Sequence, residues 1–198
     1  MLQMIKGCKV NDPTILFEGY CPKDKGWYAN VDADKLTPLF ERFIRLHNDY
    51  CFVILEVPTN QNEETDPKVR HKDVYYLDGL TPDKAIEFLH TFEKWLIHDG
   101  LLTFGIGIHS GGNELLRGKY NVVSLYTLTP EKYHGFFEKL DIPYAAELNT
   151  AWDYFTFDTP GDSFALTVDG VDIYDLLEHM KRYGLYFAER REDVRLEE

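Results

Sequence analysis

The residues from Leu101 to Tyr126 place a histidine, a carboxylate and an arginine among several glycines. The stretch reads LLTFGIGIHSGGNELLRGKYNVVSLY, and it contains His109, Glu114 and Arg117. A histidine with a carboxylate five residues further on can bind a metal or act as a base with its orienting group. These three residues are therefore the catalytic candidates of the sequence. The competing interpretation is a polar hairpin tip with no chemical role.

Metal and nucleotide sites are not supported by the same stretch. HExxH and CxxC are absent, and the three cysteines, Cys8, Cys21 and Cys51, are too few for a disulfide framework. The spacing of Gly105, Gly107 and Gly111 approaches a dinucleotide fingerprint. That fingerprint requires a long helix directly after the loop, and glycine returns at position 118. We therefore expect no metal and no cofactor.

A second constellation begins at Trp152, where aromatic residues alternate with acids in the sequence WDYFTFDTPGD. Aromatic rings beside two carboxylates suit a sugar, with stacking and general acid–base work. The same residues suit a protein interface, in which aromatic anchors are surrounded by a charged rim. We favour the interface. Its predicted partner-binding residues are Trp152, Asp153, Tyr154, Asp158 and Asp162.

The charge of the chain is strongly acidic and uneven. There are 34 acidic and 21 basic residues, which gives a net charge of −13, and the span 141–178 contains no Lys or Arg. Nucleic-acid binding requires a basic footprint, so we expect no nucleic-acid partner. A basic protein is the natural complement of such a surface. Alternatively, the acids only solubilise the surface and cap helices.

The apolar segments are short. The longest, CFVILEVP from Cys51, has the length of a strand and contains a glutamate, so we expect no membrane partner. The first residues contain a lysine and lack a cleavage pattern, so we do not expect a signal peptide. With reduced cysteines, these features favour a cytoplasmic protein. Self-association through a sheet edge or an aromatic face stays open as a homo-oligomer.

The tripeptide Leu-Thr-Pro occurs three times, at 36–38, 80–82 and 128–130, and each copy precedes an amphipathic pattern. Thr is a good helix N-cap and Pro is favoured at the next position, so each copy predicts a helix start. Asp34 competes as the cap in the first copy. The second helix is the clearest, because its apolar residues recur at spacings of three and four and Asp99-Gly100 ends it.

Strand patterns lie between these helices, at 14–20, 50–57, 74–77, 101–108 and 121–128, with a polar loop over 60–72. In 101–108, Phe104, Ile106 and Ile108 alternate with small residues, which predicts a strand with one packed face. The order indicates an α+β fold, with a mostly antiparallel sheet and helices on one face. Strand pairs between helices also suggest tandem ferredoxin-like βαβ repeats. A duplication and a reuse of capping chemistry both explain the three tripeptides.

The last third has a different pattern. Strands are expected at 154–157 and 164–168 around the turn DTPGD, followed by a helix from Asp172 to about Tyr183 and a strand at 185–188. We divide the chain into a helix and strand repeat region, 1–140, an acidic strand–helix region, 141–190, packed on the same domain, and a charged, frayed tail, 191–198.

These observations favour a cytosolic, non-enzymatic, protein-binding module of the inhibitor or immunity type that engages a basic protein partner. The alternative is a small-ligand-binding protein or a hydrolase-type enzyme with a site near the 103–117 hairpin.

Overall fold

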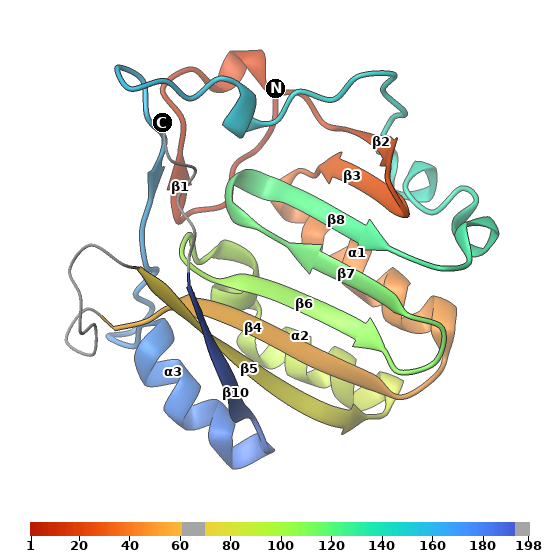
Figure 1. Cartoon of the computed structure of the whole chain (residues 1–198), viewed down its shortest axis with the longest axis vertical. Coiled ribbons are helices and arrows are strands. Elements are labelled where there is room, and N and C mark those ends of the chain that lie inside the picture. Colours follow the sequence, from red (N-terminus) through yellow and green to blue (C-terminus); the bar gives the residue numbers. More distant parts are fainter. Residues whose placement is uncertain (61–69, 193–198) are drawn as a thin grey trace.

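The chain folds around one large antiparallel sheet. The computed structural model describes residues 1–60 and 70–192, and Figure 1 shows the sheet with helices behind it. The strand order is β10-β5-β4-β6-β7-β8-β3-β2, and β1 and β9 form a separate pair. The strands are β1 (Cys8–Lys9), β2 (Gly19–Lys23), β3 (Gly26–Asn30), β4 (Cys51–Pro58), β5 (His71–Leu80), β6 (Thr103–Ile108), β7 (Asn113–Arg117), β8 (Val122–Tyr126), β9 (Asp162–Ser163) and β10 (Tyr186–Glu192).

The α+β class is confirmed, but tandem ferredoxin-like repeats are not. One split βαβ unit is present, because β5 and β6 flank β4 and are joined by the helix α2 (Pro82–His98). The other helical crossover, through α1 (Ala33–His47), joins β3 to β4 across three intervening strands. The two helical units therefore have different topologies, and their strands join a single sheet.

The three Leu-Thr-Pro tripeptides have three different outcomes. The second starts a helix as predicted: the hydroxyl of Thr81 accepts a hydrogen bond from the backbone N–H of Lys84, and Pro82 is the first helical residue. The first lies inside α1, which begins at Ala33 after the cap residue Asp32 and contains Pro38. The start predicted at Thr37 was wrong, because the helix already begins four residues earlier, at Ala33.

The third tripeptide does not begin an α-helix. Residues 130–140 form two short 3₁₀ turns, Pro130–Tyr133 and Glu138–Leu140. Gly135 lies between them with a φ of 67°, in the left-handed region, and this interrupts the predicted helix. Tyr133, Phe136 and Phe137 are nevertheless buried. The apolar spacing was recognised correctly, but the glycine prevents a continuous helix.

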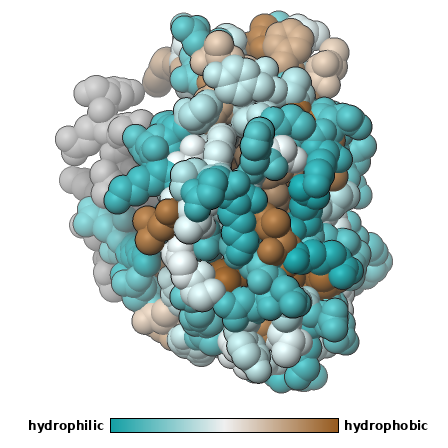
Figure 2. Space-filling view, turned by 90° about the vertical axis from the view of Figure 1, so that its right-hand side faces the viewer, coloured by the Kyte–Doolittle hydropathy of each residue, from teal (hydrophilic) through white to brown (hydrophobic). Residues whose placement is uncertain are grey.

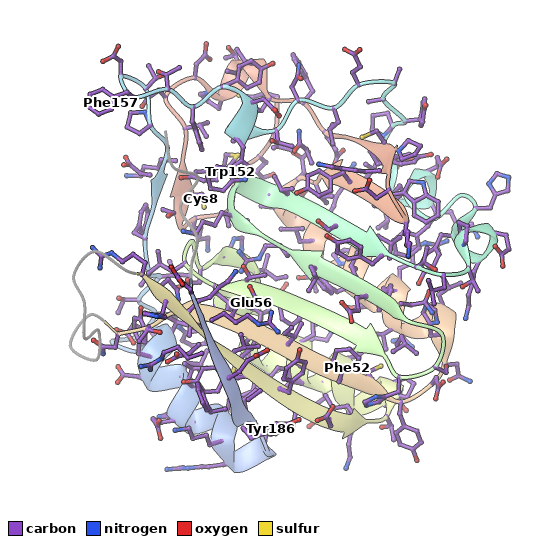
Figure 3. All side chains as sticks on the ribbon, viewed as in Figure 1. Cys8, Phe52, Glu56, Trp152, Phe157 and Tyr186 are labelled. Atoms are coloured by element: carbon purple, nitrogen blue, oxygen red, sulfur yellow. The ribbon has the colours of Figure 1, made fainter. Side chains whose placement is uncertain are left out.

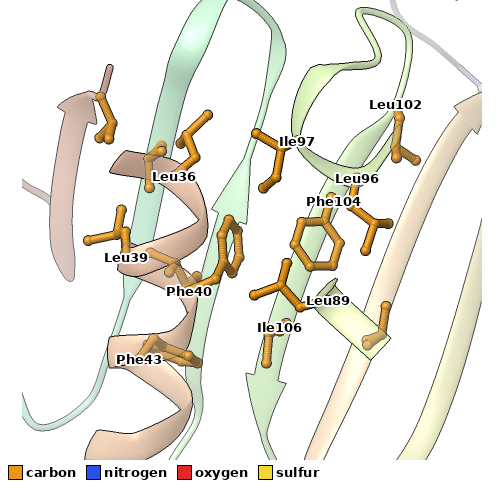
Figure 4. Packing of buried hydrophobic residues seen from close by; sticks show 14 of the residues in the cluster. Leu36, Leu39, Phe40, Phe43, Leu89, Leu96, Ile97, Leu102, Phe104 and Ile106 are labelled. Carbon is orange, nitrogen blue, oxygen red and sulfur yellow. The ribbon is translucent and has the colours of Figure 1, made fainter. Parts of the chain in front are cut away.

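The core lies between the helices and one face of the sheet, called the helix face here. Leu36, Leu39, Phe40 and Phe43 of α1 pack toward β6 from one side, and Leu89, Leu96 and Ile97 of α2 from the other (Figure 4). The rings of Phe40 and Phe104 lie 4.6 Å apart between their centroids. The helix α3 (Ile173–Met180) lies on the same face, because Tyr174 and Leu177 line a hollow with Val57 and Asp73.

The alternation predicted for 101–108 is confirmed. Phe104, Ile106 and Ile108 belong to the buried core on the helix face, while Gly105 and Gly107 lie on the opposite, open face. A Cβ atom at Gly107 would lie 2.0 Å from Cζ of Phe52. The glycine therefore allows the Phe52 ring on the adjacent strand to lie flat against the sheet. The group that lies close to the backbone at Gly107 is therefore a side chain of the protein itself.

The C-terminal third differs from its predicted pattern. Residues 154–157 and 164–168 are not strands. Asp162 and Ser163 pair with β1, and Val168 forms an isolated bridge with Val171. The α3 helix is capped as predicted, since the Asp172 carboxylate accepts from the N–H groups of Tyr174 and Asp175. The strand β10 is longer than expected and includes residues 191 and 192 of the predicted frayed tail. Residues 193–198 of that tail, and 61–69 of the predicted polar loop, lie outside the described part of the chain.

The C-terminal third shares the core of the sheet. Ala151, Ile173, Leu176, Met180 and Leu185 belong to the same buried cluster as the residues of α1, α2 and β6. In the side view of Figure 2, hydrophilic residues predominate and hydrophobic ones form small separate groups. Within residues 1–60 and 70–192, no helix has both the length and the apolar character required to cross a membrane.

Candidate functional site

The three candidates of the 103–117 hairpin do not converge. Glu114 and Arg117 are three residues apart on β7, so their side chains lie on opposite faces of the sheet. Glu114 lies on the open face, paired with Gly107 and Tyr126 on the adjacent strands. His109 follows β6 in the turn, at the other end of the hairpin from Arg117. A shared reaction centre would require these groups on one face.

Arg117 is a structural residue in this geometry. Its side chain is fully buried and caps the C-terminal end of α2. The guanidinium donates to the carbonyl oxygen of Leu96 through Nε at 3.2 Å and Nη2 at 2.8 Å, and Nη1 donates to the carbonyl oxygens of Asp99 at 3.0 Å and Gly118 at 3.3 Å. Burial lowers the pKa of Arg117 to about 10. These hydrogen bonds occupy Nε, Nη1 and Nη2 of Arg117, the donors that a substrate would need.

His109 has a carboxylate partner that sequence spacing does not identify. Its Nε2 lies 3.5 Å from Oδ1 of Asp78 on β5, and its ring centroid is 5.1 Å from that of Phe52. The same Asp78 accepts a 2.6 Å hydrogen bond from the hydroxyl of Tyr186. The histidine and the aspartate are both about half exposed, so the pair is worth roughly 1 kcal/mol or less. No group of three metal-ligating side chains occurs among the described residues.

The five predicted partner-binding residues lie on the surface of one segment but have different surroundings. The Asp153 carboxylate is engaged locally, because it accepts from the backbone N–H of Thr150 at 2.7 Å and from its hydroxyl at 2.9 Å. Asp162 lies opposite Lys9 in the β1–β9 ladder. Trp152, Tyr154 and Asp158 are exposed to solvent. We call residues 152–159 the aromatic loop.

The tip of the aromatic loop is a hydrogen-bonded turn. Backbone hydrogen bonds join Thr156 and Thr159 in both directions, and their two hydroxyls lie 2.6 Å apart. Phe157 and Asp158 are the two residues between them. The Phe157 side chain is 91% exposed, and Figure 3 shows it projecting away from the body of the molecule. The turn therefore presents an aromatic ring beside a carboxylate.

The base of the aromatic loop is fixed by ring contacts. The buried Tyr120 lies edge-on to Trp152 and Phe155, with centroid separations of 5.0 and 4.8 Å. Beside these rings is a small, mainly apolar cavity of about 130 Å³, lined by Val10, Asn11, Asp12, Ile15, Leu16, Ala151, Tyr154, Phe155 and Thr159. The loop thus combines a projecting ring with a hollow large enough for one apolar side chain.

The acids of the span 141–178 are mostly without ion-pair partners among the described residues. Of the nine acids in 141–178, only Glu178 forms an ion pair, with Lys181, within the described part of the chain. Asp153 and Asp172 accept hydrogen bonds from backbone N–H groups at the starts of helical turns. Glu147, Asp158, Asp169 and Asp175 are exposed. Among them, Asp158 directly adjoins the exposed Phe157 ring and has no ion-pair partner within the described residues.

Sequence reasoning did not identify Phe157 as the most exposed large hydrophobic side chain. It assigned residues 154–157 to a strand, in which this ring would pack. The available signal was the pair Thr156 and Thr159 directly before Pro160, since Thr hydroxyls at such spacing stabilise turns. Comparisons with protein-family models, with curated proteins and with solved structures find no match.

Proposed function

We propose that this chain is a non-enzymatic, protein-binding module that engages a basic protein through its aromatic loop. The observation that carries the proposal is Phe157, which is 91% exposed at the tip of a hydrogen-bonded turn. Aromatic side chains dominate the energetics of protein interfaces when they enter a pocket of the partner. A preordered turn also lowers the entropy lost on binding.

The chemistry of the partner follows from the charge. Asp158 adjoins the ring, and the surrounding span has no Lys or Arg from 141 to 178. A partner with an apolar pocket rimmed by Lys and Arg would complement this surface, whereas a nucleic acid would be repelled. The cavity beside Tyr154 would receive an apolar side chain of that partner. An inhibitor or immunity-type protein of the cytoplasm is the class with this profile.

The test is affinity capture with three matched baits at low and at high salt. The baits are the wild type, Phe157→Ser, and Tyr50→Ser as the control. Tyr50 is also an exposed aromatic residue. It lies two residues before Phe52, which Figure 3 shows at the opposite end of the molecule from Phe157. We expect a protein rich in Lys and Arg to be retained by the wild type and the control, lost with Phe157→Ser, and weakened by salt.

The affinity of the captured protein gives the magnitude. Loss of a central aromatic anchor costs about 2 kcal/mol, which corresponds to about a 30-fold weaker affinity for Phe157→Ser. Equal affinities of the two variants would contradict the proposal. So would a second copy of this chain as the Phe157-dependent partner, because the aromatic loop would then serve self-association.

A further inference from the structure

A groove on the open face of the sheet forms a second candidate site, separate from the tip of the aromatic loop. Its volume is about 510 Å³, within the range of pockets that hold small ligands. Thr103, Leu116 and Ser124 lie on its floor on three adjacent strands, and Gly105, next to Thr103, leaves room for the Leu116 side chain. Figure 3 shows Glu56 and Trp152 on this side of the molecule.

The hydroxyls and the indole N–H that line the groove have no hydrogen-bond partner among the described residues. Within the described residues, no hydrogen bond involves the hydroxyls of Thr103, Ser124, Tyr28 and Tyr126 or the indole N–H of Trp152. The buried hydroxyls elsewhere behave differently: Thr127 and Tyr133 both donate to the Asn113 side chain. Four hydroxyls and an indole N–H that line one groove can therefore contact a ligand without breaking a bond within the protein.

The aromatic residues supply flat surfaces at the groove. Tyr28, Tyr126 and Trp152 line it, and the last two are about half exposed. The Tyr28 ring is also contacted by the ammonium of Lys23, which lies 4.1 Å from its centroid. Aromatic side chains of this kind stack on planar rings, and base–aromatic stacking is a known source of affinity.

The groove has a local excess of positive charge on an acidic protein. Lys72, Lys119 and Glu56 are its charged lining residues. The Glu56 carboxylate is already neutralised, by Lys72 at 2.9 Å and by Arg191 at 3.2 Å. Lys119 has no ion-pair partner within residues 1–60 and 70–192. Glu114 lies one row away across the sheet, beside Tyr126, and does not line the groove.

We infer that this groove binds a small anion that carries a planar or sugar ring. The ring lies against the aromatic side chains, its polar groups contact Thr103 and Ser124, and its phosphate or carboxylate interacts with Lys119. Lysine binds such groups as a point charge. Nucleotides and acidic sugars share this chemistry, so the experiment must separate them.

The test is calorimetric titration of the full chain with five probes. These are adenosine monophosphate, adenosine, glucuronate, glucose and inorganic phosphate. We expect one ring-bearing anion to bind with a Kd below about 1 mM, at least tenfold tighter than its neutral counterpart and than phosphate. The anion that binds identifies the source. Binding of no probe, or equal binding of the neutral and anionic forms, would overturn the inference.

Two variants place the bound anion. Lys119→Gln removes the charge, and Thr103→Val removes a hydroxyl at constant shape on a strand that favours valine. Each should weaken binding of the anion about tenfold or more, which corresponds to the loss of one polar contact. Lys139→Gln, the same charge change at an exposed position outside the groove, should leave the Kd unchanged. Unchanged affinity in both groove variants would refute this site.

The site does not depend on the proposed function. Phe157→Ser should abolish partner capture and leave the Kd of the anion unchanged. Lys119→Gln should weaken binding of the anion and leave partner capture unchanged. A chain that binds the anion but captures no basic partner would contradict only the proposed function. Partner capture without binding of any probe would contradict only the groove.

Discussion

Replacement of Arg117 by Met tests whether the buried guanidinium stabilises the fold. The side chain is fully buried and satisfies three carbonyl oxygens through four hydrogen bonds. Each buried acceptor left without a donor costs about 1–3 kcal/mol, so the three together give roughly 3–9 kcal/mol. The substitution also leaves Asp99, which is buried, without this nearby positive charge.

Part of that loss is recovered, because a methionine in this position has no charge to desolvate. The expected net decrease in the free energy of unfolding is about 3 kcal/mol, a large share of the roughly 5–15 kcal/mol typical of a native protein. Arg117→Lys should lie between the wild type and the methionine variant. Lysine retains the charge, but its ammonium cannot reach three carbonyl groups in a fork.

Urea unfolding of the three proteins measures this difference, provided that their m-values agree. A methionine variant within about 1 kcal/mol of the wild type would refute the reasoning, since the desolvation cost would then equal the value of the hydrogen bonds. The predicted order of decreasing stability is wild type, Arg117→Lys, Arg117→Met. A lysine variant less stable than the methionine variant would show that the buried charge destabilises the fold.

Two further predictions concern the sheet and its flanking helix. Burial and Lys132 lower the pKa of His47 to about 4, while Asp49 opposes this shift. Because the unfolded state then binds more protons than the folded state, the free energy of unfolding should fall as the pH decreases from about 6.5 to 4. The expected decrease is about 1–2 kcal/mol after allowance for solvent screening of the partly exposed ring. His47→Gln should flatten this part of a stability curve measured by urea unfolding at each pH, and an unchanged slope would count against it. Gly107→Ala should destabilise the fold by about 1–2 kcal/mol in thermal unfolding, because its Cβ meets the Phe52 ring. Added Phe52→Ala should reduce that loss, and strictly additive effects would contradict the contact.

The sequence predicted the elements in which local chemistry and burial agree. The helix capped by Thr81 and the strand with alternating Phe104, Ile106 and Ile108 both follow from short-range rules. The strand β10 was predicted only in part. A strand was expected at 185–188, but the charged residues 189–192 resemble a solvated tail and their pairing with β5 is long-range. Arg190 of β10 donates to Asp73 at 2.6 Å, a partner 117 residues away in sequence.

The candidate site was predicted only in part. The acidic, aromatic composition of the segment at Trp152 is visible in the sequence, but the exposure of Phe157 depends on a turn that was taken for a strand. A ligand site near the 103–117 hairpin was kept as the alternative, but the residues of the groove were not identified. Thr103, Ser124 and Lys119 carry no motif, and folding brings them to one groove. His109 likewise acquires Asp78 as its partner through folding. Sites assembled across strands therefore need the sheet order, which spacing does not provide.

The most direct test of the central claim is amide hydrogen exchange of this chain with and without its captured basic partner. We predict that protection increases at residues 152–159 and at the cavity residues 10–16, and that the effect disappears with Phe157→Ser. The same experiment would contradict the account if the partner protected only other surfaces, such as the edge strand β10, and left exchange in the aromatic loop unchanged.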